Sequence, residues 1–107
     1  MRRKSNLERA YGIWQKNPTK GVFARTANGT ACCAYERCAV KFCALGACLR
    51  ASSSASSRND AYCAMALQLK DAANMLFGRL ITDVNDTLGR AATRKMFEYA
   101  IAQEKQQ

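Results

Sequence analysis

Aromatic and basic side chains alternate in the first quarter of the chain, a pattern that could hold a nucleic acid or a nucleotide. Arginine and lysine residues flank Tyr11, Trp14 and Phe23. Unpaired bases stack on aromatic rings while neighbouring cations neutralise their phosphates. Tyr11 and Trp14 also share the apolar face of an expected helix, so the alternative is that both rings belong to the core. We expect Trp14 to be mostly buried.

Three groups of basic residues are candidates for binding a polyanion. The first includes Arg25, and the second places Arg37 and Lys41 one turn apart on an expected helix. The third opens the last expected helix, whose free N–H groups also attract anions. Its Arg94 has an alternative partner in Glu98, four residues on. With two polar neighbours added, the predicted ligand-binding residues are Arg25, Arg37, Lys41, Asn85, Asp86, Arg90 and Arg94.

The charge balance also favours an anionic partner. The chain of 107 residues has 17 Lys+Arg and 8 Asp+Glu, a net charge of +9. Residues 1–50 hold ten basic and two acidic groups, whereas residues 51–107 hold seven and six. Such an excess attracts nucleic acid, nucleotides or an acidic protein surface. The alternative is that the charge serves only solubility.

Enzymatic function has little support in the residue types. Histidine is absent, which excludes Ser-His-Asp and Cys-His catalysis and every zinc site that needs imidazole. Asp83 and Asp86 are the candidate carboxylates for a metal-dependent enzyme acting on a phosphorylated substrate. The interpretation we favour is that Asn85 or Asp86 caps the last helix. No catalytic residue and no cofactor is predicted.

The six cysteines suggest a metal site at first sight. Cys33, Cys38, Cys43 and Cys48 follow one another at steps of five residues. Cys38, Cys43 and Cys48 lie on one expected helix, where such a step rotates the side chain by ~500°, so these three thiols point in different directions and cannot share an ion. We therefore predict no zinc or iron–sulfur site and expect reduced thiols that pack as small buried hydrophobes.

The periodicity of apolar residues predicts a mainly α fold of the α+β type, with four helices and a short β-hairpin after the first. Ser5 and Glu8 have the spacing of a capping box, and a helix over residues 6–16 follows. Asn28 and Gly29 form a typical two-residue turn between two β-capable runs. Residues 37–50 are apolar nearly all round, which predicts a central buried helix.

The second half of the chain is expected to consist of two further helices. Residues 51–59 form a flexible Ser-rich connection, after which Asn59 or Asp60 caps a helix that ends at Gly78. A last helix follows the cap-rich residues 82–87. All 107 residues belong to one expected domain. Because no signal peptide and no membrane-spanning run is visible, we expect a cytoplasmic protein without membrane contact.

Several short motifs follow one another along most of the chain, in the order Trp14, GVFAR at 21–25, NG at 28–29, FCALGA at 42–47, VND at 84–86, GR at 89–90 and MFEYAI at 96–101. This order resembles a family of small uncharacterised proteins from bacteria and phages. The Ser-rich stretch and the additional cysteines depart from the family's pattern. The resemblance implies a phage or mobile-element context and assigns no chemistry.

These observations leave three function classes. The first is a small basic protein of phage or mobile-element origin that captures a polyanion, either nucleic acid or a nucleotide signal, or that docks on an acidic host protein surface and blocks a nucleic-acid-handling host defence complex. The second is the small metal-dependent enzyme built on Asp83 and Asp86. The third is a scaffold that forms homo-oligomers.

Overall fold

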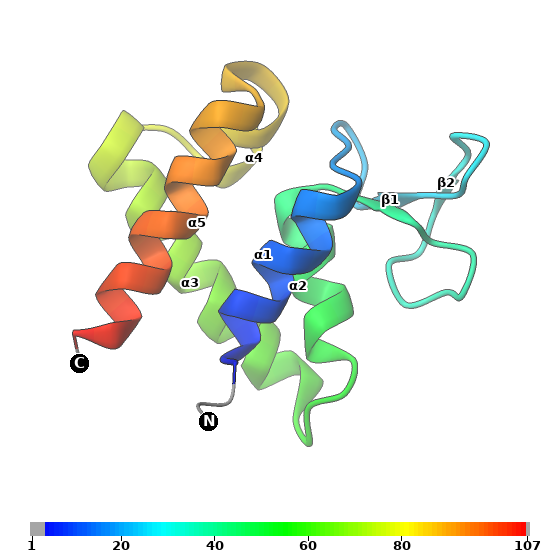
Figure 1. Ribbon diagram of the computed structural model, residues 1–107, viewed down its shortest axis with the longest axis horizontal. Helices are drawn as coiled ribbons and strands as arrows, with labels where there is room; N and C mark the ends of the chain where they lie inside the picture. Colours follow the sequence, from blue (N-terminus) through cyan, green and yellow to red (C-terminus); the bar gives the residue numbers. More distant parts are fainter. Residues whose placement is uncertain (1–3, 107) are drawn as a thin grey trace.

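The computed structural model describes residues 4–106, most of which lie in helices (Figure 1). The elements in chain order are α1 (Asn6–Lys16), β1 (Ala24–Arg25), β2 (Ala31–Cys32), β3 (Lys41–Phe42), α2 (Ala44–Ser52), α3 (Arg58–Phe77), α4 (Ile81–Asp83), the π-helical turn η1 (Val84–Leu88) and α5 (Arg90–Lys105). The predicted mainly α fold with a small β part is confirmed. Beyond the four predicted helices, the chain adds the short turns α4 and η1.

Helix α1 begins at the predicted capping box. The Ser5 hydroxyl accepts a hydrogen bond from the Glu8 N–H at 3.1 Å, and the Glu8 carboxylate accepts one from the Ser5 N–H at 3.0 Å. Leu7 and Trp14 are buried on the inner face of the helix, as the apolar spacing predicts. Trp14 is only 1 % exposed, so its ring belongs to the core and cannot serve as an open stacking platform.

The hairpin belongs to a three-stranded antiparallel sheet in the order β2-β1-β3. β1 pairs with both neighbours, so that Arg25 lies opposite Ala31 on one side and Lys41 on the other. This pairing corrects the prediction of a helix over residues 37–50. An apolar run of this kind fits a buried strand as well as a helix, and its first part pairs with β1.

Helix α2 therefore begins only at Ala44, with Cys43 as its N-cap residue. Its Gly46 lies against the chain before β1, because a Cβ atom there would come within 1.8 Å of the Phe23 carbonyl oxygen. The absence of a side chain at Gly46 thus allows α2 to contact the extended segment before β1.

The Ser-rich connection is shorter than predicted. Ser52 is buried in the last turn of α2, and α3 begins at Arg58. Ser57 occupies the N-cap position without a side-chain hydrogen bond, whereas Asn59 and Asp60 lie inside the first turn. The predicted capping role of these two residues is therefore wrong. Gly78 ends α3 in the left-handed conformation at φ +63°, as expected.

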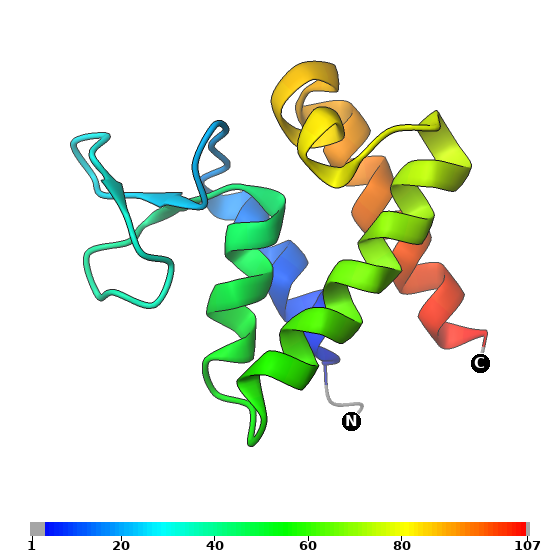
Figure 2. The same cartoon turned by 180° about the vertical axis from the view of Figure 1, so that it is seen from behind.

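The helices form one packed body from which the β1–β2 arm extends away from α3 and α5 (Figures 1 and 2). α1 packs on α2 and α5, and α3 packs on both α2 and α5. The core between them includes the rings of Trp14 and Phe97, whose centroids are 5.6 Å apart. None of the helices within residues 4–106 combines the length and the apolar character that a membrane crossing requires.

Candidate functional site

The N-terminus of α5 has free N–H groups because of the residue that precedes it. Gly89 adopts φ +95°, a backbone conformation that side chains other than glycine rarely tolerate. The N-cap position therefore has no side chain, and no side chain of residues 4–106 caps the helix. The first N–H groups of α5, at Arg90, Ala91 and Ala92, have no hydrogen-bond acceptor in this part of the chain, and the helix dipole favours an anion there.

A cleft of about 410 Å³ opens beside this helix end. Two cationic residues from distant parts of the sequence line it, Lys20 in the segment after α1 and Arg90 in the first turn of α5. Both are exposed, and Arg90 reaches the Gln15 carbonyl oxygen only at 3.5 Å. Their charges are thus available to a bound anion.

Trp14 also lines the cleft. Its indole Nε1 is inaccessible to solvent and has no hydrogen-bond partner among residues 4–106. A buried donor left unpaired costs about 1–3 kcal/mol. Because Nε1 has no exposed surface, a ligand in the cleft contacts other parts of the cleft wall and not this atom.

Asn85 and Asp86 form a corner at the edge of the cleft. The Asn85 Oδ1 accepts a hydrogen bond from the Ala44 N–H at 3.0 Å, and its Nδ2 donates to the Thr19 carbonyl at 3.0 Å and to Asp86 Oδ1 at 2.8 Å. Asp86 Oδ1 also accepts the Gly21 N–H at 3.2 Å. The corner therefore joins η1 to the segment after α1 and to α2.

These bonds correct the predicted role of the two residues. Asn85 caps α2, which is distant in sequence, and neither Asn85 nor Asp86 caps α5. Asn85 is buried, with 8 % of its surface exposed. Its side chain is saturated with hydrogen bonds, so it positions the corner and has little capacity left for a ligand.

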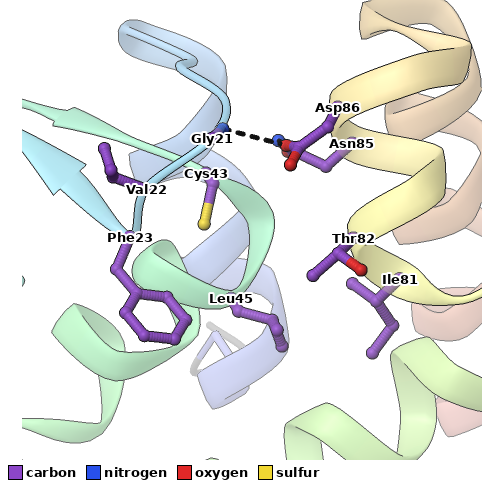
Figure 3. A pocket seen from close by; sticks show the side chains of 9 residues that line it. All are labelled: Gly21, Val22, Phe23, Cys43, Leu45, Ile81, Thr82, Asn85 and Asp86. Carbon is purple, nitrogen blue, oxygen red and sulfur yellow. Dashed lines mark hydrogen bonds between the residues drawn. The ribbon is translucent and has the colours of Figure 1, made fainter.

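A second, largely apolar pocket of about 200 Å³ lies on the other side of this corner (Figure 3). Val22, Phe23, Leu45 and Ile81 form its apolar walls. Figure 3 shows the Asn85 and Asp86 side chains reaching from η1 toward Gly21 across the top of the pocket. The two hollows thus share Asn85 and Asp86.

Cys43 lines the apolar pocket, where its sulfur accepts the Gly46 N–H at 3.3 Å. Burial raises the pKa of the Cys43 thiol, although hydrogen bonds from the N–H groups of Gly46 and Leu45 act in the opposite direction. A thiol that stays protonated is a poor nucleophile. Its position makes it a helix cap and a wall of the pocket.

The structure separates the remaining predicted residues from the cleft. Arg25 lies in β1, where its guanidinium donates to Thr19 Oγ1 and to the carbonyls of Gly29 and Lys20 at 3.0–3.2 Å. Arg25 is therefore a structural residue. Lys41 lies opposite it in β3 and Arg37 is exposed in the loop before β3, so the predicted pairing of these two on one helix face is wrong.

Arg94 lies one turn beyond Arg90 and is exposed outside the cleft. The alternative ion pair with Glu98 does not form within the described part of the chain, where Glu98 instead accepts a hydrogen bond from the Tyr11 hydroxyl at 3.2 Å. Of the predicted set, the structure brings Asn85, Asp86 and Arg90 together at one site.

The two carboxylates of the enzyme hypothesis do not share a hollow. Asp86 borders the cleft and the apolar pocket, whereas Asp83 lines a separate depression that also includes Lys70 and Arg79. Within residues 4–106, no three Cys, Asp or Glu side chains gather closely enough to hold a metal ion.

The cysteines differ in their burial, against the expectation that all are packed inside. Cys48 and Cys43 are buried, Cys32 is half-buried, and Cys33, Cys38 and Cys63 are exposed. The exposed thiols of Cys33 and Cys38 lie in the loop between β2 and β3, and Cys38 lies there because the helix expected from residue 37 begins only at Ala44.

Gly89 and the indole N–H of Trp14 were not predicted as site residues, and Lys20 was considered only as one of the basic residues that flank the aromatic rings. Gly89 had a usable signal, since a glycine directly before a helical run leaves the N-cap position without a side chain. The unpaired indole N–H had none, because hydrogen-bond saturation depends on tertiary neighbours.

Comparison of the chain with protein-family models, curated proteins and solved structures gives no match. The resemblance to small bacterial and phage proteins therefore stays a prediction, and the functional conclusion depends on the site itself.

Proposed function

We propose that the protein is a binding protein that captures a phosphorylated ligand in the cleft at the N-terminus of α5. The observation that carries this proposal is the meeting of an uncapped helix end with two exposed cations, Lys20 and Arg90, in one hollow. Both features supply hydrogen-bond donors or positive charge. Phosphate oxygens are the acceptors that such an arrangement suits best.

Among residues 4–106, Asp86 is the one carboxylate that lines the cleft, and it opposes anion binding. Its Oδ1 already accepts hydrogen bonds from the Gly21 N–H and from Asn85 Nδ2, which offset part of its charge. Lys20, Arg90 and the dipole of α5 together outweigh the remaining repulsion. A ligand phosphate is therefore expected on the Arg90 side of the cleft.

The phage or mobile-element context is part of the proposal. A protein of that origin that captures a phosphorylated signal would interfere with a host process that depends on the signal. Docking on an acidic host protein surface is the competing mode, and it predicts that small phosphorylated compounds do not bind.

Calorimetric titration with inorganic pyrophosphate tests the proposal. We expect binding at low ionic strength and a loss of about tenfold in affinity for Arg90→Gln, because hydrogen bonds to charged groups contribute about 1.5–3 kcal/mol. Arg94→Gln is the matched control, since it removes the same charge one turn further along α5 and outside the cleft. Equal losses for both variants, or no binding to the unaltered protein, would refute the proposal.

A further inference from the structure

The apolar pocket has the character of a subsite for a neutral ring. Val22, Leu45 and Ile81 supply apolar surface, and Phe23 at its wall is 49 % exposed. No Lys or Arg side chain of residues 4–106 lines it, in contrast to the cleft beside it. Ligand pockets of this kind bury an apolar or aromatic group and orient it with a few polar atoms.

Asp86 supplies the polar atom between the two hollows. Its Oδ1 is occupied by two donors, whereas its Oδ2 accepts no hydrogen bond from residues 4–106. A carboxylate oxygen close to a phosphate site is a common acceptor for a ribose hydroxyl. The corner thus lies where the sugar of a nucleotide would connect its phosphate to its base.

We propose that the ligand is a mononucleotide, an inference that rests on the phosphate-binding function proposed above. The phosphate lies at the N-terminus of α5 with Arg90 and Lys20. The ribose hydroxyls donate to Asp86 Oδ2. The base enters the apolar pocket between Leu45 and Ile81 and contacts the ring of Phe23.

Other phosphorylated compounds use less of this surface. Inorganic phosphate or pyrophosphate fills only the cleft, and a sugar phosphate reaches Asp86 but leaves the apolar walls in water. An acyl chain would pack against the apolar walls of the pocket. To enter the pocket from the cleft, however, it would have to pass the Asp86 carboxylate, which is unfavourable for an apolar group. A base, which is planar and carries hydrogen-bonding edges, suits both features.

The first part of the test compares ligands on the unaltered protein. AMP, GMP, CMP and UMP are titrated alongside ribose 5-phosphate and pyrophosphate. We expect at least one nucleotide to bind about tenfold more tightly than ribose 5-phosphate, the gain that contact of one base with an aromatic ring provides.

The second part measures the nucleotide and pyrophosphate affinities of two variants, Thr82→Trp and Asp86→Asn, which should change the two affinities differently. Thr82→Trp places a large side chain at the pocket from an exposed position, so it should reduce nucleotide affinity to that of ribose 5-phosphate. Thr30→Trp, on the exposed turn of the hairpin, is its control. Asp86→Asn removes the ribose acceptor and a repulsive charge, so it should weaken nucleotide binding and leave pyrophosphate binding equal or tighter.

The outcomes separate this inference from the proposed function. If pyrophosphate binds but no nucleotide binds more tightly than ribose 5-phosphate, the base subsite is wrong and phosphate binding stands. If nucleotides bind tightly and both variants leave that affinity unchanged, the placement is also wrong. If neither pyrophosphate nor any nucleotide binds, the proposed function itself is refuted.

Discussion

The Trp14 ring packs against the rings of Tyr11 and Phe97, which also contact each other, while its indole N–H has no partner among the described residues. The apolar spacing of α1 predicts the burial of the ring, because a ring on the inner face of a helix joins the core. Whether the indole N–H finds an acceptor depends on which carbonyls and carboxylates surround the ring after folding. Burial of a residue can thus be read from sequence more readily than the saturation of its polar atoms.

Cys48 provides a prediction at the scale of a single residue. Burial raises the pKa of its thiol from 9.0 to about 12. As the pH rises, the Cys48 thiol therefore loses its proton in the unfolded chain before it does so in the folded protein. The contribution of the buried thiol to the free energy of unfolding is complete below about pH 9 and is lost as the pH rises toward 12. The stability advantage of the unaltered protein over Cys48→Ala should shrink by about 1.4 kcal/mol between pH 8 and pH 10.

Urea unfolding of both proteins at the two pH values measures this change. Taking the difference between the two proteins removes the contribution of the tyrosines and lysines that they share. A stability difference that stays constant from pH 8 to pH 10 would show that Cys48 is accessible to water in the folded state.

At the scale of elements, the error over residues 37–50 has a clear physical cause. The run is apolar on every side, and periodicity cannot distinguish a buried helix from a buried strand when no polar face exists. Strand pairing distinguishes the two structures here. β3 forms hydrogen bonds with β1, and α2 then begins at Ala44, after its N-cap residue Cys43. Helix α1, which has one polar face, has the bounds that its pattern predicts.

Gly46 tests the contact that fixes α2 against the segment before β1. A Cβ atom at this position would lie 1.8 Å from the Phe23 carbonyl oxygen, so Gly46→Ala forces two backbone segments apart. We expect a loss of about 3 kcal/mol in the free energy of unfolding, at the upper end of the range for overpacking.

Gly12→Ala is the matched control for this substitution. Gly12 lies inside α1, is exposed, and has no atom within 4 Å of an added Cβ. The change should stabilise the protein by about 0.5–1 kcal/mol, because alanine loses less backbone entropy in a helix. Urea unfolding reports both values, and a Gly46→Ala variant as stable as the unaltered protein would contradict the described packing.

Over the whole molecule, the net charge of +9 predicts the class of partner but not the place where it binds. The guanidinium groups of Arg25 and Arg50 donate hydrogen bonds to backbone carbonyls and stabilise the β1–β2 arm and the loop that follows it. The cleft combines Lys20 from the strongly basic half with Arg90 from the nearly neutral half. Charge counting along the chain cannot find such a site, because folding brings its residues together.

Nuclear magnetic resonance of the ¹⁵N-labelled protein during a pyrophosphate titration tests the central claim most directly. Trp14 is the single tryptophan of the chain, so the spectrum contains one indole N–H signal. We predict that this signal shifts together with the amide signals of Arg90, Ala91 and Ala92, with one shared dissociation constant. Shifts confined to Arg37, Lys41 and the β1–β2 arm, with the indole signal unmoved, would contradict the assignment of the site to the cleft at α5.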